Sequence, residues 1–151
     1  MDKTFEHFTV TIMKLNKLVQ RIKIFEMEEY GLKAIHVMCG YFLREHEEGL
    51  TATELAKHTL EDKAAISRAL AQMKEKGYVR YGSATYNAKI KLTDEGKRLA
   101  DEILSKADRA VEAGQAGFNG EERVRFYETL ESIADRLAAY YAELSGGKAN
   151  G

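Results

Sequence analysis

Residues 50–96 constrain the fold more than any other part of this chain, because they read as a short helix, a tight turn, a second short helix and a two-stranded ribbon. We expect the first helix over about residues 54–58, with Thr53 as its N-cap. Asp62 is the expected N-cap of the second helix, and Gly77 ends it. The apolar residues of the second helix fall on one face and are Ile66, Leu70 and Met73. Two short helices with a turn between them are the layout that places a recognition helix in the major groove of DNA.

The ribbon that follows is predicted to form a wing. Its strands are expected at residues 78–81 and 89–92, and residues 82–88 form the loop between them. Thr93 is the expected cap of another helix that begins with Asp94 and Glu95, because acidic side chains favour the first turn of a helix.

The rest of the chain is predicted to be helical. It contains no proline, and apolar residues at helical spacing mark helices over about residues 5–25, about 32–46 and from about 121 onward. Between Gly114 and Gly120 the pattern breaks. The buried stripe of the second of these helices is expected to consist of Ile35, Met38, Phe42 and Leu43. The expected fold class is mainly α with a small β-hairpin wing, in which a winged helix-turn-helix lobe is joined to a helical dimerisation region.

We expect one structural domain with four functional stretches. Residues 1–46 hold N-terminal helices for dimerisation and for support of the lobe, and residues 47–96 form the winged helix-turn-helix lobe. Residues 97–145 supply C-terminal dimerisation helices, and residues 146–151 form a disordered tail. The terminal helices carry more apolar residues than a winged core could cover, so a partner copy is expected; a self-contained bundle is the alternative.

Composition excludes several classes of protein. The chain has 151 residues, a single cysteine and no run of 18 apolar residues, so we expect neither an internal disulfide nor a membrane span. Its first residues are charged and do not resemble a secretion signal, which indicates a cytoplasmic protein. It contains no glycine-rich phosphate loop, no Gly-x-Ser-x-Gly and no His or Cys spacing typical of metal sites. We therefore expect no catalytic residues, no metal and no cofactor.

The distribution of charge is more informative than the net charge of −1. Between Leu50 and Arg98 the chain has ten basic and six acidic residues, a local charge of +4. DNA binding depends on such a basic face rather than on the overall charge, although an ordinary solvated surface can show the same imbalance.

The motifs together resemble the MarR family of winged-helix transcriptional regulators. The matching pattern is Leu50-Thr51-x-x-Glu54-Leu55-Ala56, then Asp62-Lys63-x-x-Ile66-Ser67-Arg68-x-Leu70, Met73, Lys76-Gly77-Tyr78-Val79 and Lys91-Leu92-Thr93-Asp94-Glu95-Gly96. Each piece alone is common, but their order and spacing are specific. The resemblance implies a homodimer that binds a near-palindromic site on double-stranded DNA, with half-sites roughly 34 Å apart, and that acts as a repressor.

The resemblance also implies which residues contact DNA. The N-terminal half of the recognition helix would present Lys63, Ala64, Ala65, Ser67 and Arg68 to the groove. Arginine can bind guanine bidentately, and alanine methyl groups can contact thymine. Lys57, Lys63 and Lys74 are expected to contact phosphates, which position the helix without specifying the sequence, and Lys89 and Lys91 at the base of the wing are available for further phosphates. Thr53 is also counted among the DNA-binding residues. The alternative for Arg68 is a surface salt bridge to Glu61 or Glu75.

The wing departs from the family pattern. Family wings typically carry charged residues, with an arginine at the tip, whereas the loop of residues 82–88 has no charge. We expect weaker reading of the minor groove, or a tip that contacts DNA through Tyr86 or Asn87.

Many members of this family release DNA when a small aromatic or anionic effector binds beside the lobe. The candidate effector residues in this chain are Met13, Phe25, Tyr30, His36, Met38 and Cys39. A plain hydrophobic core is the alternative interpretation of these residues. Cys39 also raises the possibility of a redox-sensing regulator, although its position in mid-helix favours a buried structural residue.

Two other functions stay open. One is a winged-helix protein-interaction module without DNA binding, which the uncharged wing loop favours and the basic lobe opposes. The other is a DNA-binding protein of a different winged-helix family.

Overall fold

The structure is a computed structural model that describes residues 3–146. The predicted tail of residues 146–151 therefore lies outside the described residues, apart from Gly146. The chain divides into two compact units, residues 1–110 and residues 111–151. No helix within residues 3–146 is both long enough and apolar enough to cross a membrane.

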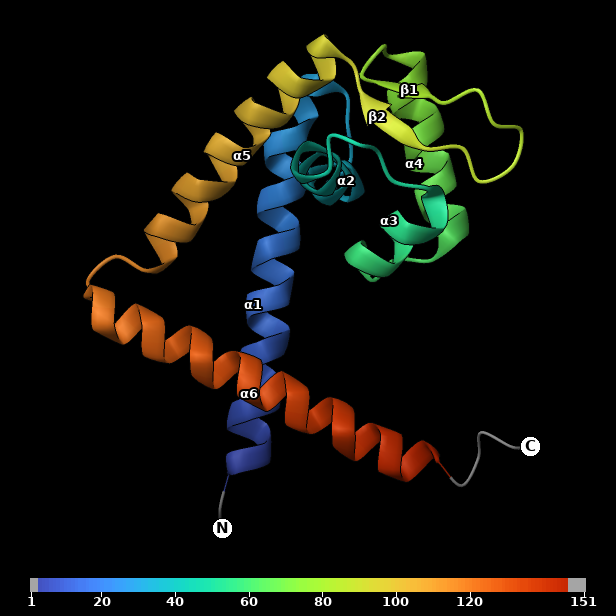
Figure 1. The fold of residues 1–151 in the computed structure, drawn as a ribbon. Helices are drawn as coiled ribbons and strands as arrows, with labels where there is room; N and C mark the ends of the chain where they lie inside the picture. Colours follow the sequence, from blue (N-terminus) through green and yellow to red (C-terminus); the bar gives the residue numbers. More distant parts are fainter. Residues whose placement is uncertain (1–2, 147–151) are drawn as a thin grey trace. The chain divides into compact units, whose positions relative to one another are not determined.

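The first unit contains the lobe and the helices that support it (Figure 1). Its elements, in chain order, are α1 (Thr4–Met27), a 3-10 turn (Glu28–Tyr30), α2 (Ala34–Glu45), α3 (Ala52–Thr59), α4 (Lys63–Glu75), β1 (Val79–Tyr81), β2 (Ile90–Leu92) and most of α5 (Asp94–Gly114). The fold class predicted from the sequence is confirmed: the described residues are mainly helical, with one two-stranded antiparallel hairpin.

Two hydrophobic clusters hold this unit together. The first joins α2, α3, α4 and the hairpin, and its fully buried centre includes Leu43, Leu55, Ile66, Leu70 and Ile90. The second joins the end of α1 to α2 and α5, and it consists of Met27, Leu32, Val37, Leu99 and Ile103. Helix α2 contributes to both clusters, so it is buried on more than one side.

That position of α2 corrects the predicted stripe. Leu43 is buried as expected, but Ile35, Met38 and Phe42 are only partly buried. The fully buried residues of α2 also include His36, Val37, Cys39 and Gly40. A single amphipathic stripe was the wrong description, because α2 packs against α1, α3, α4 and β2.

The hairpin is short and its register is fixed. Val79 pairs with Leu92, Arg80 with Lys91, and Tyr81 with Ile90. Leu50 forms an isolated bridge to Ile90, which ties the segment before α3 to β2. Because side chains alternate along a strand, Val79, Ile90 and Leu92 face the core while Arg80 and Lys91 face away from it.

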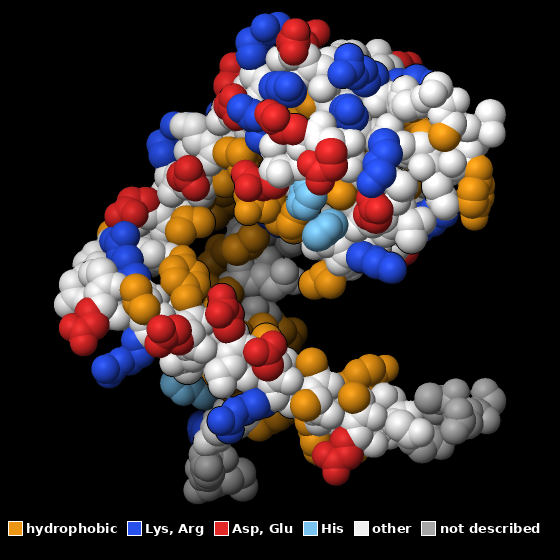
Figure 2. Space-filling view, viewed as in Figure 1, with side chains coloured by type: hydrophobic (Ala, Val, Ile, Leu, Met, Phe, Trp, Pro, Cys, Tyr) orange, Lys and Arg blue, Asp and Glu red, His pale blue; other side chains and the backbone are white. Residues whose placement is uncertain are grey.

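The second unit contains the end of α5 and helix α6 (Gly120–Ser145). Asn119 caps α6 by accepting a hydrogen bond from the Glu122 amide at 2.9 Å. Arg123 holds the carboxylate of Glu112 through two contacts of 2.9 Å, which fixes the turn between the helices. No residue of α6 is buried in the described chain, and apolar side chains lie open along it (Figure 2).

Candidate nucleic-acid interface

Helix α3 begins two residues earlier than predicted from the sequence, at Ala52 and not at Glu54. The prediction that Thr53 is the N-cap is wrong: Thr51 is the cap, and its hydroxyl accepts a hydrogen bond from the Glu54 amide at 3.1 Å. The Glu54 carboxylate in turn accepts from the Thr51 amide at 2.9 Å. This reciprocal pair is a capping box, which needs threonine three residues before glutamate, and Thr53 does not meet that spacing.

The turn between α3 and α4 contains a leucine with a positive φ, and the side chain of this leucine is exposed to solvent. Leu60 ends α3 in the left-handed conformation, with φ of 60°, and its side chain is 92% exposed. Asp62 then caps α4, as predicted, by accepting a hydrogen bond from the Ala65 amide at 2.8 Å. The cap satisfies a backbone amide in the first turn of α4 and so fixes where the helix begins.

Helix α4 presents one polar face to solvent and one apolar face to the core. Ile66, Ala69, Leu70 and Met73 are buried, as the helical spacing predicted. The opposite face is open, and its exposed residues include Lys63, Ala64, Ser67, Arg68 and Lys74. The structure therefore brings five of the predicted contact residues onto one surface. Figure 1 shows α3 and the hairpin beside this helix.

Thr53 and Ala65 are less open than the other predicted contact residues. Both are half-buried, and the Ala65 amide is occupied by the Asp62 cap. Their expected role in DNA contact stays a prediction.

The guanidinium of Arg68 is free within the described chain. It makes no ion pair and no hydrogen bond with any residue from 3 to 146, so the salt bridges to Glu61 or Glu75 considered above do not form here. A free guanidinium on an exposed helix face can bind a base edge or a phosphate bidentately.

Lys74 is held over an aromatic ring of the hairpin. Its Nζ lies 4.8 Å from the centre of the Tyr81 ring, within the range of a cation–π interaction. Sequence reasoning missed Tyr81, although the strand pattern places it next to α4. The contact fixes the lysine charge at the C-terminal end of the open face.

Two of the predicted contact lysines, Lys89 just before β2 and Lys91 within it, have different surroundings. Lys89 forms an ion pair with Glu54 at 3.3 Å, so it connects the wing to the first turn of α3. The hydrogen bond from the Thr51 amide is the main cause that lowers the pKa of Glu54; burial opposes it, and Lys89 lowers the pKa further. Lys91 lies on the outward face of the hairpin and has no ion-pair partner among the described residues.

The wing loop is open. Tyr86 is 80% exposed, and Asn87 adopts a left-handed conformation with φ of 50°. Figure 2 shows lysine and arginine side chains over the hairpin and the first turns of α5, with acidic side chains among them.

Among the described residues, the candidate effector residues differ in their surroundings. Met13 and Phe25 lie on α1 with 64% and 75% of their surfaces exposed, whereas His36 and Cys39 are buried. Tyr30 donates a hydrogen bond from its hydroxyl to Glu102 at 3.1 Å, and burial is the main cause that raises its pKa.

His36 is a structural link between α2 and α4. Its Nδ1 accepts from the Lys33 amide at 2.8 Å, and its Nε2 lies 3.2 Å from the Ala69 carbonyl oxygen. Because Nδ1 is an acceptor, the proton is on Nε2, which donates to Ala69. Burial lowers the pKa of His36, so the ring is neutral when these bonds are made.

Cys39 has the surroundings of a structural thiol. It is completely buried in the first cluster, and burial raises its pKa to about 12. Reactive cysteines have a lowered pKa and are accessible, so both observations oppose the redox interpretation.

Comparison with known proteins agrees with the resemblance predicted from the sequence. Residues 30–86 match the model of the MarR family, a stretch that contains α2, α3, α4 and β1. No curated protein sequence matches the chain.

Solved structures extend the agreement to the fold of nearly the whole chain. A MarR transcriptional regulator from Methanosarcina mazei Go1 is 21% identical, with a TM-score of 0.80 over 93% of this chain and 94% of that one. A MarR-family regulator from Listeria monocytogenes, solved in complex with a 26mer DNA, is 18% identical, with a TM-score of 0.74 over 99% and 97%. CouR from Rhodococcus jostii RHA1, solved with p-coumaroyl-CoA, is 22% identical, with a TM-score of 0.74 over 84% and 91%.

Proposed function

We propose that this chain, whose fold is that of the MarR-family regulators and whose lobe matches the MarR family model, is a sequence-specific DNA-binding transcriptional regulator. We propose that it acts as a repressor and binds a palindromic operator as a homodimer. The observation that carries the proposal is the open face of α4, on which Ser67 and the unpaired Arg68 lie beside Lys63. The Listeria monocytogenes protein of similar fold was solved with DNA, which supports this assignment.

Each contact residue has a role that follows from its chemistry. Arg68 and Ser67 would contact base edges in the major groove, and the Ala64 methyl group would contact a thymine methyl. Lys63, Lys74 and Lys89 would contact phosphates, which position the helix without reading the sequence. We propose residues 47–96 as the DNA-binding lobe, and residues 1–46 and 97–145 as the stretches that form the dimer.

The effector part of the proposal concerns release from DNA. CouR, which shares the fold, was solved with an aromatic acyl-CoA, so a small aromatic or anionic effector is consistent with this architecture. Met13, Phe25, Tyr30, His36 and Cys39 stay the candidates from sequence. In a dimer the exposed Met13 and Phe25 would have a partner surface that one chain does not provide.

The decisive experiment selects fragments of the source genome with the purified protein and then titrates the recovered site. We expect a palindrome whose affinity falls steeply as salt rises, because each neutralised phosphate contributes a slope of about −0.9 in log K against log salt. Arg68→Ala should weaken binding about 5- to 150-fold, which corresponds to about 1–3 kcal/mol for a bidentate base contact.

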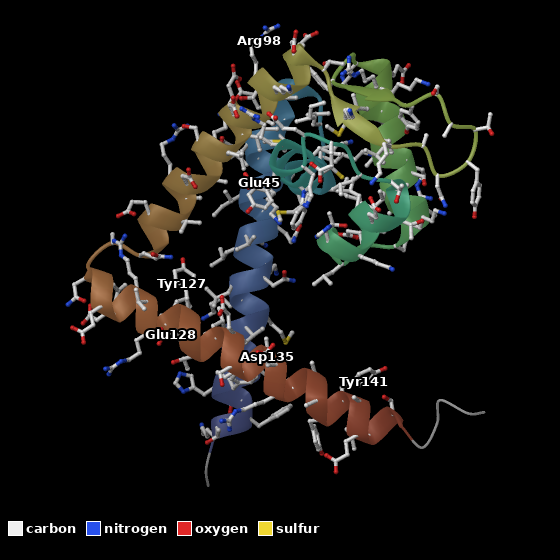
Figure 3. The ribbon with its side chains drawn as sticks, viewed as in Figure 1. Glu45, Arg98, Tyr127, Glu128, Asp135 and Tyr141 are labelled. Carbon is white, nitrogen blue, oxygen red and sulfur yellow. The ribbon has the colours of Figure 1, made fainter. Side chains whose placement is uncertain are left out.

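Arg98→Ala is the matched control, because Arg98 is an exposed arginine on the first turns of α5, away from α4 (Figure 3). A folded dimer that enriches no site would contradict the proposal. That result would favour the protein-interaction module, for which the uncharged wing loop is the supporting observation.

A further inference from the structure

A small polar cavity lies on the outward side of the hairpin. It has a volume of about 70 Å³ and is formed where the end of α2, strands β1 and β2 and the first turn of α5 meet. Its lining residues are Leu43, Arg44, Glu47, Arg80, Lys91, Leu92 and Lys97. The cavity is separate from the open face of α4, because the inward face of the hairpin packs between them.

The charges around this cavity are unbalanced. Arg80 and Lys91 are direct cross-strand partners, and like charges in that position destabilise a hairpin. Neither they nor Lys97 make an ion pair or a side-chain hydrogen bond within residues 3–146. Three unpaired cations therefore face one cavity.

The other two charged residues at the cavity largely neutralise one another. Arg44 forms ion pairs with Asp101 at 2.8 Å and with Glu47 at 3.3 Å. The hydrogen bond to the Asp101 carboxylate, followed by the negative charge of that carboxylate, is the main cause that raises the pKa of Arg44. Arg44 thus forms a fixed wall, and the excess positive charge comes from Arg80, Lys91 and Lys97.

From this arrangement we infer that the cavity binds a single phosphate group. Its volume equals that of about two water molecules, which suits one tetrahedral oxyanion inside the cavity. Arg80 supplies a planar fork for two phosphate oxygens, and Lys91 and Lys97 add point charges. A bound phosphate would remove the repulsion between Arg80 and Lys91 and would tie the wing to α2 and α5.

The phosphate has two sources with the same chemistry. It can be a free phosphate or phosphomonoester, or it can be a phosphate of the DNA backbone; the second case rests on the proposed function. Both predict the same contacts with Arg80 and Lys91, but they differ in whether the protein needs DNA to fill the cavity.

The first arm of the test uses inorganic phosphate and the free protein. We expect the phosphorus-31 NMR signal of phosphate to broaden on addition of the wild-type chain and of Arg98→Gln. The double variant Arg80→Gln/Lys91→Gln should show at least a tenfold weaker effect. Arg98 is the matched control, because it is next to Lys97 in sequence and does not line the cavity. Lys97→Gln provides a second variant if circular dichroism shows that the double variant does not fold.

A gain-of-affinity variant sharpens this arm. Glu47→Gln removes the acidic group from the cavity wall and releases one contact of Arg44. Phosphate should then bind about two- to fivefold more tightly, as expected for the loss of one exposed like-charged neighbour of the ligand.

The second arm measures the salt dependence of DNA binding. If the phosphate belongs to the backbone, the double variant should reduce the slope by about 0.9 for the lost phosphate contact, whereas Arg98→Gln should not. An effect in the first arm alone identifies a free anion, an effect in the second alone identifies the backbone, and effects in both support the site for either source. No difference between wild type and double variant in either arm overturns the inference. If the wild-type chain binds no DNA, the proposed function fails, while the NMR arm still decides the phosphate site.

Discussion

At the scale of single residues, His36 shows how one buried polar side chain can join two elements. It is 1% exposed, and it connects the backbone before α2 to a carbonyl in the middle of α4. Protonation would turn Nδ1 into a donor facing the Lys33 amide, and Lys33 and Lys76 add unfavourable positive charge. The position of α4 therefore depends on a neutral ring.

This link predicts a pH dependence of stability. Because the pKa of His36 is lowered on folding, the unfolded chain binds more protons, so its contribution is full above the unfolded pKa of about 6.5 and is lost as pH falls below that value. Urea unfolding between pH 7.5 and 5 should show a falling free energy of unfolding, and His36→Gln should have a flatter profile.

The difference between the two profiles removes the contribution of the other histidines. The carboxylates of Glu29, Glu54 and Glu112, whose pKa values are lowered, lose stability only as pH falls below about 4.5, outside this window. Identical slopes for wild type and variant would refute the role of His36.

Cys39 gives a second prediction at this scale. With a pKa raised to about 12 by burial, almost no thiolate exists at pH 8, and no reagent can reach the sulfur without local opening. We expect Ellman's reagent to leave the folded protein unmodified and to react with one thiol per chain in urea. Rapid reaction of the native protein would restore the redox-sensor interpretation.

At the scale of the elements, local sequence signals predicted most of the fold. Helical spacing located α1, α4 and α6, and single side chains marked the caps at Asp62 and Thr93. The start of α3 was missed because a threonine lies at both 51 and 53, and only the distance to Glu54 distinguishes them.

Long-range pairs could not be predicted in the same way. Arg44 and Asp101 are 57 residues apart, and Lys106 contacts Glu26, which lies 80 residues before it, as well as Glu29. Such contacts depend on how the helices pack against one another, and the local sequence pattern of one helix does not predict this packing. The phosphate cavity was missed for the same reason, because its cations come from four separate segments.

The junction between the wing and α5 depends on one glycine. A Cβ atom at Gly96 would overlap the carbonyl oxygen of Tyr78, which accepts a hydrogen bond from the Thr93 amide at 3.0 Å. Gly96→Ala should therefore destabilise the chain by about 1–3 kcal/mol, although alanine favours helices by about 1 kcal/mol. Thermal unfolding measures the change.

Gly40→Ala is the matched control for this prediction. Gly40 is also a buried helical glycine, but its added Cβ would lie 3.9 Å from the Ala100 Cβ, an ordinary contact. It should be neutral or stabilising by up to about 1 kcal/mol. Equal losses in both variants would show that the backbone approach at Tyr78 is not the cause.

At the scale of the whole molecule, the long terminal helices leave apolar surface that one chain does not cover. Along α6, apolar residues recur every three or four positions, and Leu137 and Tyr140 are 51% and 58% exposed. Tyr127 and Tyr141 also project from this helix (Figure 3). Helix α1 repeats the pattern, with Phe8 and Ile12 more than 40% exposed. Surfaces of this kind in water are typical of a subunit interface.

We therefore expect a homodimer with twice the chain mass of 17.0 kDa in light scattering at micromolar concentration. Leu130→Glu/Leu137→Glu places two charges on the apolar stripe of α6, where burial against a partner would desolvate them. This variant should elute as a monomer and lose operator binding, because one recognition helix cannot span both half-sites.

Ser132→Glu is the control for this last prediction, because residue 132 is exposed and lies two positions from Leu130, on another side of the helix. It should stay dimeric and bind DNA normally. A folded wild-type monomer would contradict the dimer. A dimeric double variant would instead move the interface from α6 to α1, where Phe8→Glu is then the substitution that should dissociate it.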